Sequence, residues 1–186
     1  MTRRGDIACA TVAPMRRALL AACLLATAAG CGYHLVGTSS FLPDDLTELY
    51  VERFENRTSW SDIDQRLNEA ITAEWVRRRR FDLVESREAT QLVLEGTIQA
   101  VVITPVTFDD RGRATEYQMS ISAHVRLVDV RGDEPQVLWE DKAFSRRTSY
   151  EVDVRAVDYF DRQSEAMNEL SEEYGRALVS AVLEGF

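Results

Sequence analysis

The residue with the most specific chemistry in this 186-residue chain is Cys31. An uncharged and mostly apolar run, residues 18–30, precedes it, and Met15-Arg16-Arg17 leads that run. A positive start, a short apolar centre and small residues before the cut are typical of a secretory signal. Because a cysteine follows the small residues directly, we expect processing by signal peptidase II and a lipid on Cys31. Ordinary secretion with an unmodified thiol is the alternative.

The apolar run is shorter than the roughly 20 residues that a transmembrane helix needs. We therefore expect residues 1–30 to be a lipoprotein signal peptide, with Met15 as an alternative start. Residues 31–45 are expected to form a lipidated tether, and residues 46–186 a single domain. Gly32, in place of aspartate, follows the cysteine and favours the outer membrane.

The charge of the chain limits its partners. Without residues 1–30 the chain keeps 18 basic and 30 acidic residues, a formal charge of −12. This balance disfavours nucleic acid and other polyanions as general partners. An anionic ligand would need a local basic patch.

Catalytic motifs are missing from the sequence. It contains no Gly-x-Ser-x-Gly, His-Glu-x-x-His, Walker loop or Cys-x-x-Cys. His34 and His124 are the only histidines, which disfavours a zinc site. His124 falls on the polar side of its predicted strand, so we interpret it as a surface residue. We expect no enzyme activity and no cofactor, and a periplasmic hydrolase is disfavoured.

Two apolar stripes at helical spacing predict two amphipathic helices. The first helix should end near Arg80, with Ser59 and Asp62 as candidate capping residues. Its stripe consists of Ile63, Leu67, Ile71 and Trp75. The second stripe lies within residues 167–182, and Asp161 is a candidate cap for that helix.

Four arginines, residues 77–80, close the first predicted helix. Cations are favourable at a helix C-terminus because they interact with the backbone dipole. We favour this structural role. A patch that binds anionic lipid or lipopolysaccharide is the alternative.

Residues 46–54, 81–85, 91–104, 114–129 and 137–148 predict strands. Within the third, Leu92, Leu94, Ile98, Ala100 and Val102 share one parity, so we place them on one face. A turn signal at residues 109–112 joins arms 91–108 and 114–129 into a hairpin. Because strands usually have about 5–6 residues, we expect part of this hairpin to project from the domain.

These elements predict an α+β domain, an α/β sandwich. Two helices should pack on one face of a mixed, mainly antiparallel sheet of about four to five strands. One-sided helices and a one-sided sheet can then bury their apolar faces against each other.

A series of short segments covers essentially the whole chain after residue 30. They are CGYHL at 31–35, FENRT at 54–58, RRFDLV at 79–84, GTI at 96–98, GRATEY at 112–117, VRLVD at 125–129, VLWE at 137–140 and AVLEGF at 181–186. In order and spacing they resemble the LptE family of LPS-assembly lipoproteins. The resemblance implies a two-helix, mixed-sheet fold that is anchored by its lipid on the periplasmic side of the outer membrane.

The resemblance also implies partners. The family plugs the β-barrel LptD, assists its assembly and serves the insertion of lipopolysaccharide at the cell surface. It binds lipopolysaccharide partly through basic residues near loop tips, and the matching tip here is residues 109–113. Arg111 and Arg113 are therefore candidate phosphate ligands, because a guanidinium can engage two oxygens at once. A solvated turn is the alternative for these two residues. The alternative function is another envelope lipoprotein, acting as a non-catalytic activator or a secretion pilot protein.

Overall fold

The computed structural model describes residues 42–43, 45–152 and 159–185. Along the chain these residues form β1 (Glu48–Val51), β2 (Glu55–Asn56), α2 (Ile63–Arg78), β3 (Asp82–Leu83), β4 (Leu92–Phe108), β5 (Ala114–Asp129), β6 (Gln136–Glu151) and α3 (Tyr159–Glu184). A short 3-10 helix, Arg87–Ala89, precedes β4. The expected fold class is confirmed, and the sheet has six strands because β2 and β3 contribute two residues each.

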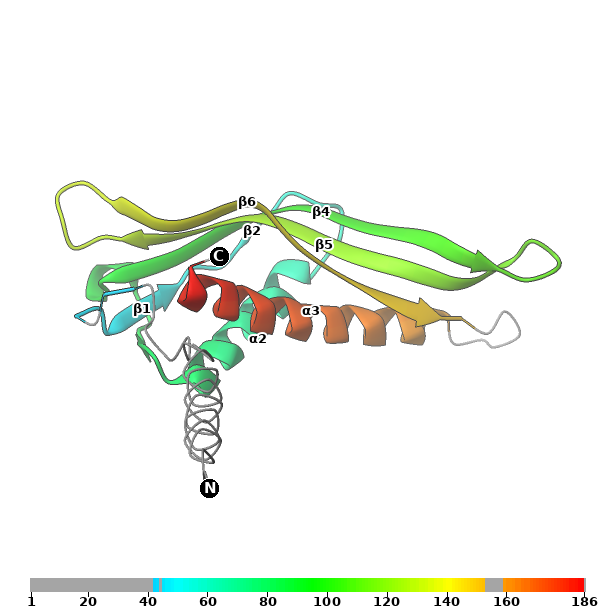
Figure 1. The fold of residues 1–186 in the computed structure, drawn as a ribbon, viewed down its shortest axis with the longest axis horizontal. Coiled ribbons are helices and arrows are strands. Elements are labelled where there is room, and N and C mark those ends of the chain that lie inside the picture. The colour runs from blue at the N-terminus through cyan, green and yellow to red at the C-terminus, as the bar shows by residue number, and fades with distance from the viewer. Residues whose placement is uncertain (1–41, 44, 153–158, 186) are drawn as a thin grey trace, which may run out of the picture. The chain divides into compact units, whose positions relative to one another are not determined.

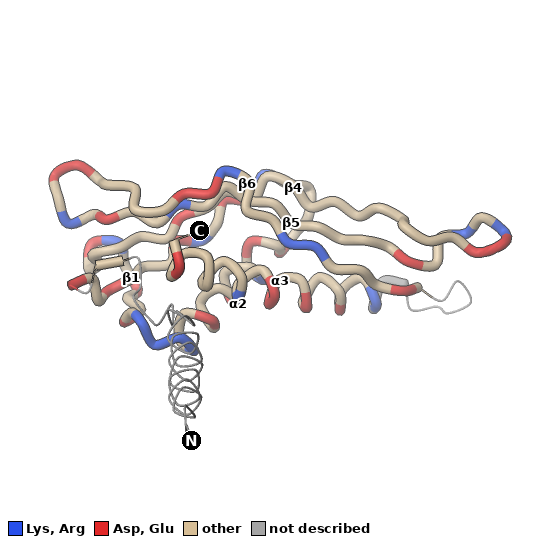
Figure 2. The backbone as a smooth tube through the Cα atoms, viewed as in Figure 1, with Lys and Arg blue, Asp and Glu red and all other residues tan. Residues whose placement is uncertain are grey.

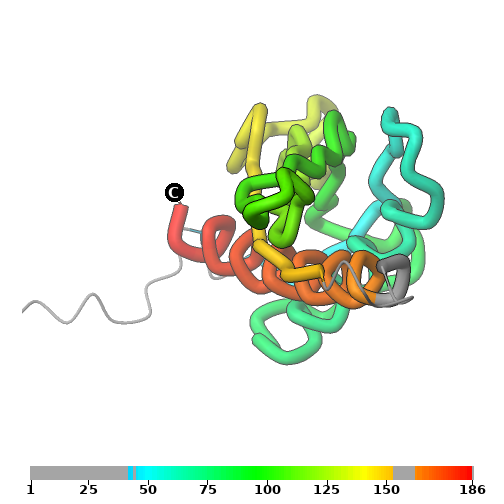
Figure 3. The backbone as a smooth tube through the Cα atoms, turned by 90° about the vertical axis from the view of Figure 1, so that its right-hand side faces the viewer, coloured from blue at the N-terminus to red at the C-terminus, as the bar shows by residue number. Residues whose placement is uncertain are grey.

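The sheet is mixed, with strand order β3-β1-β4-β5-β6 and with β2 beside β4. β1 runs parallel to β3 and β4, and β2 runs parallel to β4. β4, β5 and β6 are long antiparallel neighbours. Both helices lie on the same side of the strands (Figure 1), and the view along the sheet shows the same arrangement (Figure 3).

The core lies between the helices and the sheet. The predicted stripe of α2 is buried, since Ile63, Leu67, Ile71 and Trp75 are each at most 1% exposed. Tyr174 of α3 packs edge-on against Phe144 of β6, with ring centroids 5.2 Å apart. Burying a large apolar side chain contributes about 1.5–3 kcal/mol, so these one-sided patterns drive the two layers together.

The predicted side-chain cap of α2 does not form. Asp62 precedes α2, but its φ of 64° lies in the left-handed region and its side chain makes no cap hydrogen bond. A capping side chain needs extended backbone geometry, which Asp62 lacks. Asn56 orders this loop instead, because its Oδ1 accepts the N–H of Thr58 at 2.9 Å. α3 begins at Tyr159, so Asp161 lies inside its first turn.

The prediction that β4 keeps one face along its length is wrong. Ile98 and Ala100 pair with consecutive residues of β5, so Gln99 is an extra residue. A bulge of this kind reverses the alternation of side chains. Beyond it Val101 packs against the core, whereas Val102 is 50% exposed. A strict period of two cannot reveal the bulge, because it assumes unbroken pairing.

The long hairpin is confirmed by β4 and β5, which have 17 and 16 residues. β6 accompanies it only as far as the pair Glu116 and Glu151, so the hairpin tip runs on past β6. Among the described residues, no helix is both long and apolar enough to cross a membrane.

Candidate functional site

The tip of the β4–β5 hairpin, residues 109–113, is a tight turn built by backbone hydrogen bonds. The N–H of Asp109 donates to the carbonyl of Arg113, and the N–H of Gly112 donates to the carbonyl of Asp109, both at 2.9 Å. Gly112 has φ of 75°, a conformation that glycine adopts without steric cost. The sequence signal for the turn is therefore confirmed.

The carboxylate of Asp109 organises this tip. Its Oδ1 accepts the backbone N–H groups of Arg111 and Arg113, each at 2.9 Å. Its Oδ2 accepts Nε and Nη2 of Arg113 at 2.9 and 2.7 Å. The backbone N–H of Arg113, followed by its guanidinium, holds the pKa of Asp109 below its ordinary value. Asp109 therefore stays ionised and fixes the turn.

The two candidate arginines consequently differ. Arg113 binds Asp109 through one edge of its guanidinium, Nε and Nη2. Within the described part of the chain, the guanidinium of Arg111 makes no ion pair or side-chain hydrogen bond. Asp110 is exposed beside it, so the tip carries both signs of charge (Figure 2). Because the charges of the tip sum to zero, anion binding here would depend on the unpaired guanidinium of Arg111.

Exposed apolar side chains on β4 lead to the tip, and their exposure was not predicted from the sequence. Val102, Val106 and Phe108 are 50%, 46% and 56% exposed, which makes them three of the five large hydrophobic residues exposed in the described structure. A signal was present in the sequence, because residues 99–108 contain no charged residue. The tip thus offers a cation next to apolar surface, a combination that suits an amphiphile with a phosphate headgroup.

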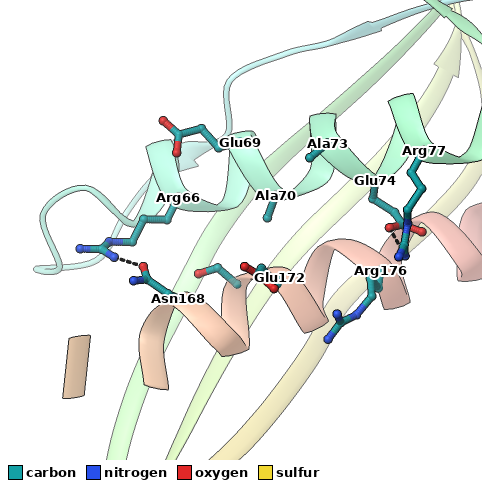
Figure 4. Close-up of a pocket in the computed structure, with 10 residues that line it drawn as sticks. Arg66, Glu69, Ala70, Ala73, Glu74, Arg77, Asn168, Glu172 and Arg176 are labelled. Carbon is teal, nitrogen blue, oxygen red and sulfur yellow. Dashed lines mark hydrogen bonds and ion pairs between the residues drawn. The ribbon is translucent and has the colours of Figure 1, made fainter. Parts of the chain in front are cut away.

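A groove of about 490 Å³ lies between α2 and α3 (Figure 4). Three arginines and three glutamates are among its lining residues: Arg66, Arg77, Arg176, Glu69, Glu74 and Glu172. Several are already engaged, since Arg66 donates to Asn168 and Arg77 pairs with Glu74. The balanced and partly paired charges give this groove no preference for an ionic ligand.

The arginine run at residues 77–80 serves mainly the fold. Arg77 and Arg78 both pair with Glu74, whose side chain is only 4% exposed. Arg80 donates to the carbonyls of Leu46 and Pro43 at 3.0 and 3.1 Å. The structural reading is therefore favoured over a lipid patch, because three of the four side chains have partners inside the domain.

Two arginines fix the start of the described domain. Arg80 holds the backbone at residues 43 and 46, as above, and Nη1 of Arg131 binds Asp45 at 2.6 Å. Arg131 also pairs with Asp129 at 2.7 Å, so this segment is bound to the end of β5. Cys31, the leader before it and residues 31–41 lie outside the described residues.

Other polar residues contact one another on the face of the sheet opposite the helices. His124 contacts Glu140 at 2.7 Å, which places it on the polar face, as the sequence predicts. The hydrogen bond from His124 lowers the pKa of Glu140. Arg126 binds Glu95 at 2.5 Å on the same face. The described residues contain no cluster of histidine, cysteine, aspartate and glutamate that could hold a metal ion.

Comparison with solved structures finds the same fold in other proteins. The chain is similar to the hypothetical protein CT253 of Chlamydia trachomatis, with TM-score 0.52 and 13% identity over 76% of this chain and 97% of that one. It is also similar to a candidate lipoprotein of Caulobacter crescentus, with TM-score 0.50 and 11% identity over 73% and 87% of the two chains. Rare lipoprotein B of Shewanella oneidensis matches with TM-score 0.47 and 16% identity over 75% and 92%.

Comparison with curated protein sequences finds no match. A family model does match: LptE, described as lipopolysaccharide-assembly, covers residues 46–182. This range includes all six strands, α2 and nearly all of α3. The chain therefore belongs to the LptE family of lipopolysaccharide-assembly proteins.

Proposed function

We propose that this chain is a non-catalytic lipoprotein of the outer membrane that assembles with the β-barrel LptD and plugs it. In this role it assists the transport and insertion of lipopolysaccharide at the cell surface. The observation that carries the proposal is the family match over residues 46–182, which spans nearly the whole described fold. A two-layer domain with a projecting hairpin suits a protein that works by fitting another protein.

The proposed anchor is an acyl group on Cys31, on the periplasmic side of the membrane. Arg80 and Arg131 bond the first described residues to the domain, at the end from which such a tether would extend. Mass spectrometry of the mature protein tests the anchor: we expect an acylated amino terminus at Cys31, and a bare thiol would contradict it.

The proposed contact with lipopolysaccharide lies at the hairpin tip. Arg111 is free to bind a phosphate group, whereas Arg113 already pairs its charge with Asp109 and keeps only its Nη1 side for another anion. We therefore infer that Arg111 makes the primary contact and that Arg113 chiefly keeps the turn in shape. Phe108, at the base of the tip, offers apolar surface beside this contact.

Purification of the intact lipoprotein from outer membranes tests the partner. We expect a stable complex with a large β-barrel that survives washing in mild detergent. Recovery with peptidoglycan enzymes alone would contradict the proposal and favour an activator of another envelope process.

Charge reversal tests the lipopolysaccharide contact. Arg111→Glu should weaken binding of the full protein to lipopolysaccharide at least several-fold, because a bidentate contact is replaced by repulsion. Arg147→Glu is the matched control, since this exposed arginine lies on β6 away from the tip. A dephosphorylated lipopolysaccharide should bind wild type and Arg111→Glu alike. If Arg111→Glu and Arg147→Glu weakened lipopolysaccharide binding equally, the effect would come from the overall charge of the protein, and Arg111 would be removed from the site.

A further inference from the structure

β4 has an unpaired edge along its distal half. On the side away from β5, β1 pairs with β4 at residues 92–94 and β2 pairs with it at residues 97 and 98. The last backbone contact on that side is from the N–H of Arg57 to the carbonyl of Ile98, at 3.1 Å. From residue 99 to 108, β4 has β5 as its only partner strand in the described structure, as Figure 1 shows. An unpaired edge presents backbone N–H and C=O groups that can bond another strand.

The two edge strands of the long antiparallel region differ in charge. β6, at the other edge, carries Glu140, Asp141, Lys142, Arg146, Arg147 and Glu151. Charged side chains on an edge strand discourage pairing with other chains. Residues 99–108 of β4 carry no charge, although 28% of the whole chain is charged, and Figure 2 shows this contrast. The fold thus protects one edge and leaves the other available.

Irregularities limit the available edge to a short segment. Gln99 is the extra residue of one bulge, and a second register shift lies between Pro105 and Thr107. Pro105 also lacks an N–H group and cannot donate to a ladder. Regular pairing is therefore possible over residues 100–104, a length of about 17 Å at ~3.3 Å per residue. Val102, at its centre, is half exposed on the open face of the sheet.

We propose that the edge at residues 100–104 accepts an extended, uncharged segment of the partner barrel as an additional strand. This inference rests on the proposed function. Backbone groups on this edge can pair with an extended segment, and the absence of charge favours an uncharged one. Strands of a closed barrel have both edges paired, so the added segment is a loop of the barrel that enters its lumen. A ladder of five residues is too short to hold two copies of this chain together alone, but it can fix the register within a larger interface.

Photo-crosslinking of the full acylated chain, expressed with its barrel, tests this geometry. A crosslinking amino acid is placed at one position at a time, from residue 100 to residue 104. Strand addition predicts adducts on a single barrel segment, which advance by one residue for each step along β4. Three results would overturn the inference: a complex that forms without adducts, adducts on scattered segments of the barrel, or adducts between two copies of this chain.

Paired substitutions give a second readout. Val102→Lys combined with Val106→Lys should lower recovery of the barrel at least several-fold, because one cation then lies at the centre of the edge and the other just beyond its end. Val137→Lys is the matched control, since Val137 is 47% exposed on β6. Circular dichroism should show that both variants fold. If wild type recovers no barrel, the proposed function fails together with this inference. If the double variant recovers as much barrel as wild type, and the crosslinked position on the barrel does not advance along with the position on β4, only the inference on the edge fails.

Discussion

Gly175 lies where α3 crosses α2, at a point where the two backbones touch. A Cβ atom added at Gly175 would lie 2.9 Å from both the carbonyl carbon and the oxygen of Ala70, and 3.1 Å from the nitrogen of Ile71. Ordinary contacts of a Cβ atom are 3.4–4 Å, so the helices must separate by about half an ångström. No rotamer change relieves this contact, because the atoms it meets belong to the backbone. We therefore choose Gly175→Ala as the most direct probe of the helix layer.

The size of the effect follows from two opposing contributions. Overpacking a close contact costs about 1–3 kcal/mol, whereas alanine favours a helix interior over glycine by about 1 kcal/mol. We expect a net loss of about 1 kcal/mol, or about 2–4 °C in the melting temperature for a domain of this size. Gly175→Val should lose about 2–3 kcal/mol, since two more methyl groups enter the same space and the gain in helix propensity is smaller.

Urea denaturation followed by circular dichroism measures both variants. Gly132→Ala is the control, because a Cβ atom there would lie 3.6 Å from its nearest neighbour, the carbonyl oxygen of Glu134. Its stability should stay within about 0.5 kcal/mol of wild type. If Gly175→Ala were more stable than wild type, the helix crossing would be looser than the structure indicates, and the reasoning would be refuted.

Three further predictions concern the hairpin tip and the core. The folded pKa of Asp109 lies below its ordinary value of 3.8, so its contribution to the turn is complete above that value and is lost as the pH falls through the lowered pKa. NMR should show the Nε–H signal of Arg113 moving toward the shift of an unbonded guanidinium over that range, and Asp109→Asn, whose neutral side chain has no such titration, should lack the transition. Glu74→Ala should reduce the free energy of unfolding by about 1–2 kcal/mol, because a buried carboxylate that binds two arginines is removed; unchanged stability in urea would show that these pairs contribute nothing. Trp75→Ala should reduce the free energy of unfolding by about 3–5 kcal/mol in the same assay, because the side chain is fully buried. A loss below about 1 kcal/mol would mean that the surrounding residues close the cavity freely.

Local patterns predicted most of the architecture. The buried stripe of α2 and the alternating strand β5 were both read correctly, because each depends on a periodicity that neighbouring residues establish among themselves. β2 was missed, because the polar residues 55 and 56 look like the end of a strand in the sequence. They form a strand only by pairing with Thr97 and Ile98. The cap of α2 also differs from the expectation: Asp62 directly precedes the helix, but its backbone is left-handed and its side chain makes no cap hydrogen bond.

The candidate site shows the same division. By itself, the sequence determined the family segments, the two amphipathic helices, the long hairpin and the presence of two arginines at its tip, because composition and spacing are properties of the chain. Only the tertiary structure decided that Asp109 engages Arg113 and leaves Arg111 free. It alone decided that β4 turns Val102 outward after Gln99 and that the edge of β4 away from β5 lies unpaired beyond Ile98. These features depend on where one strand stops and another inserts an extra residue, which the pairing of distant segments decides.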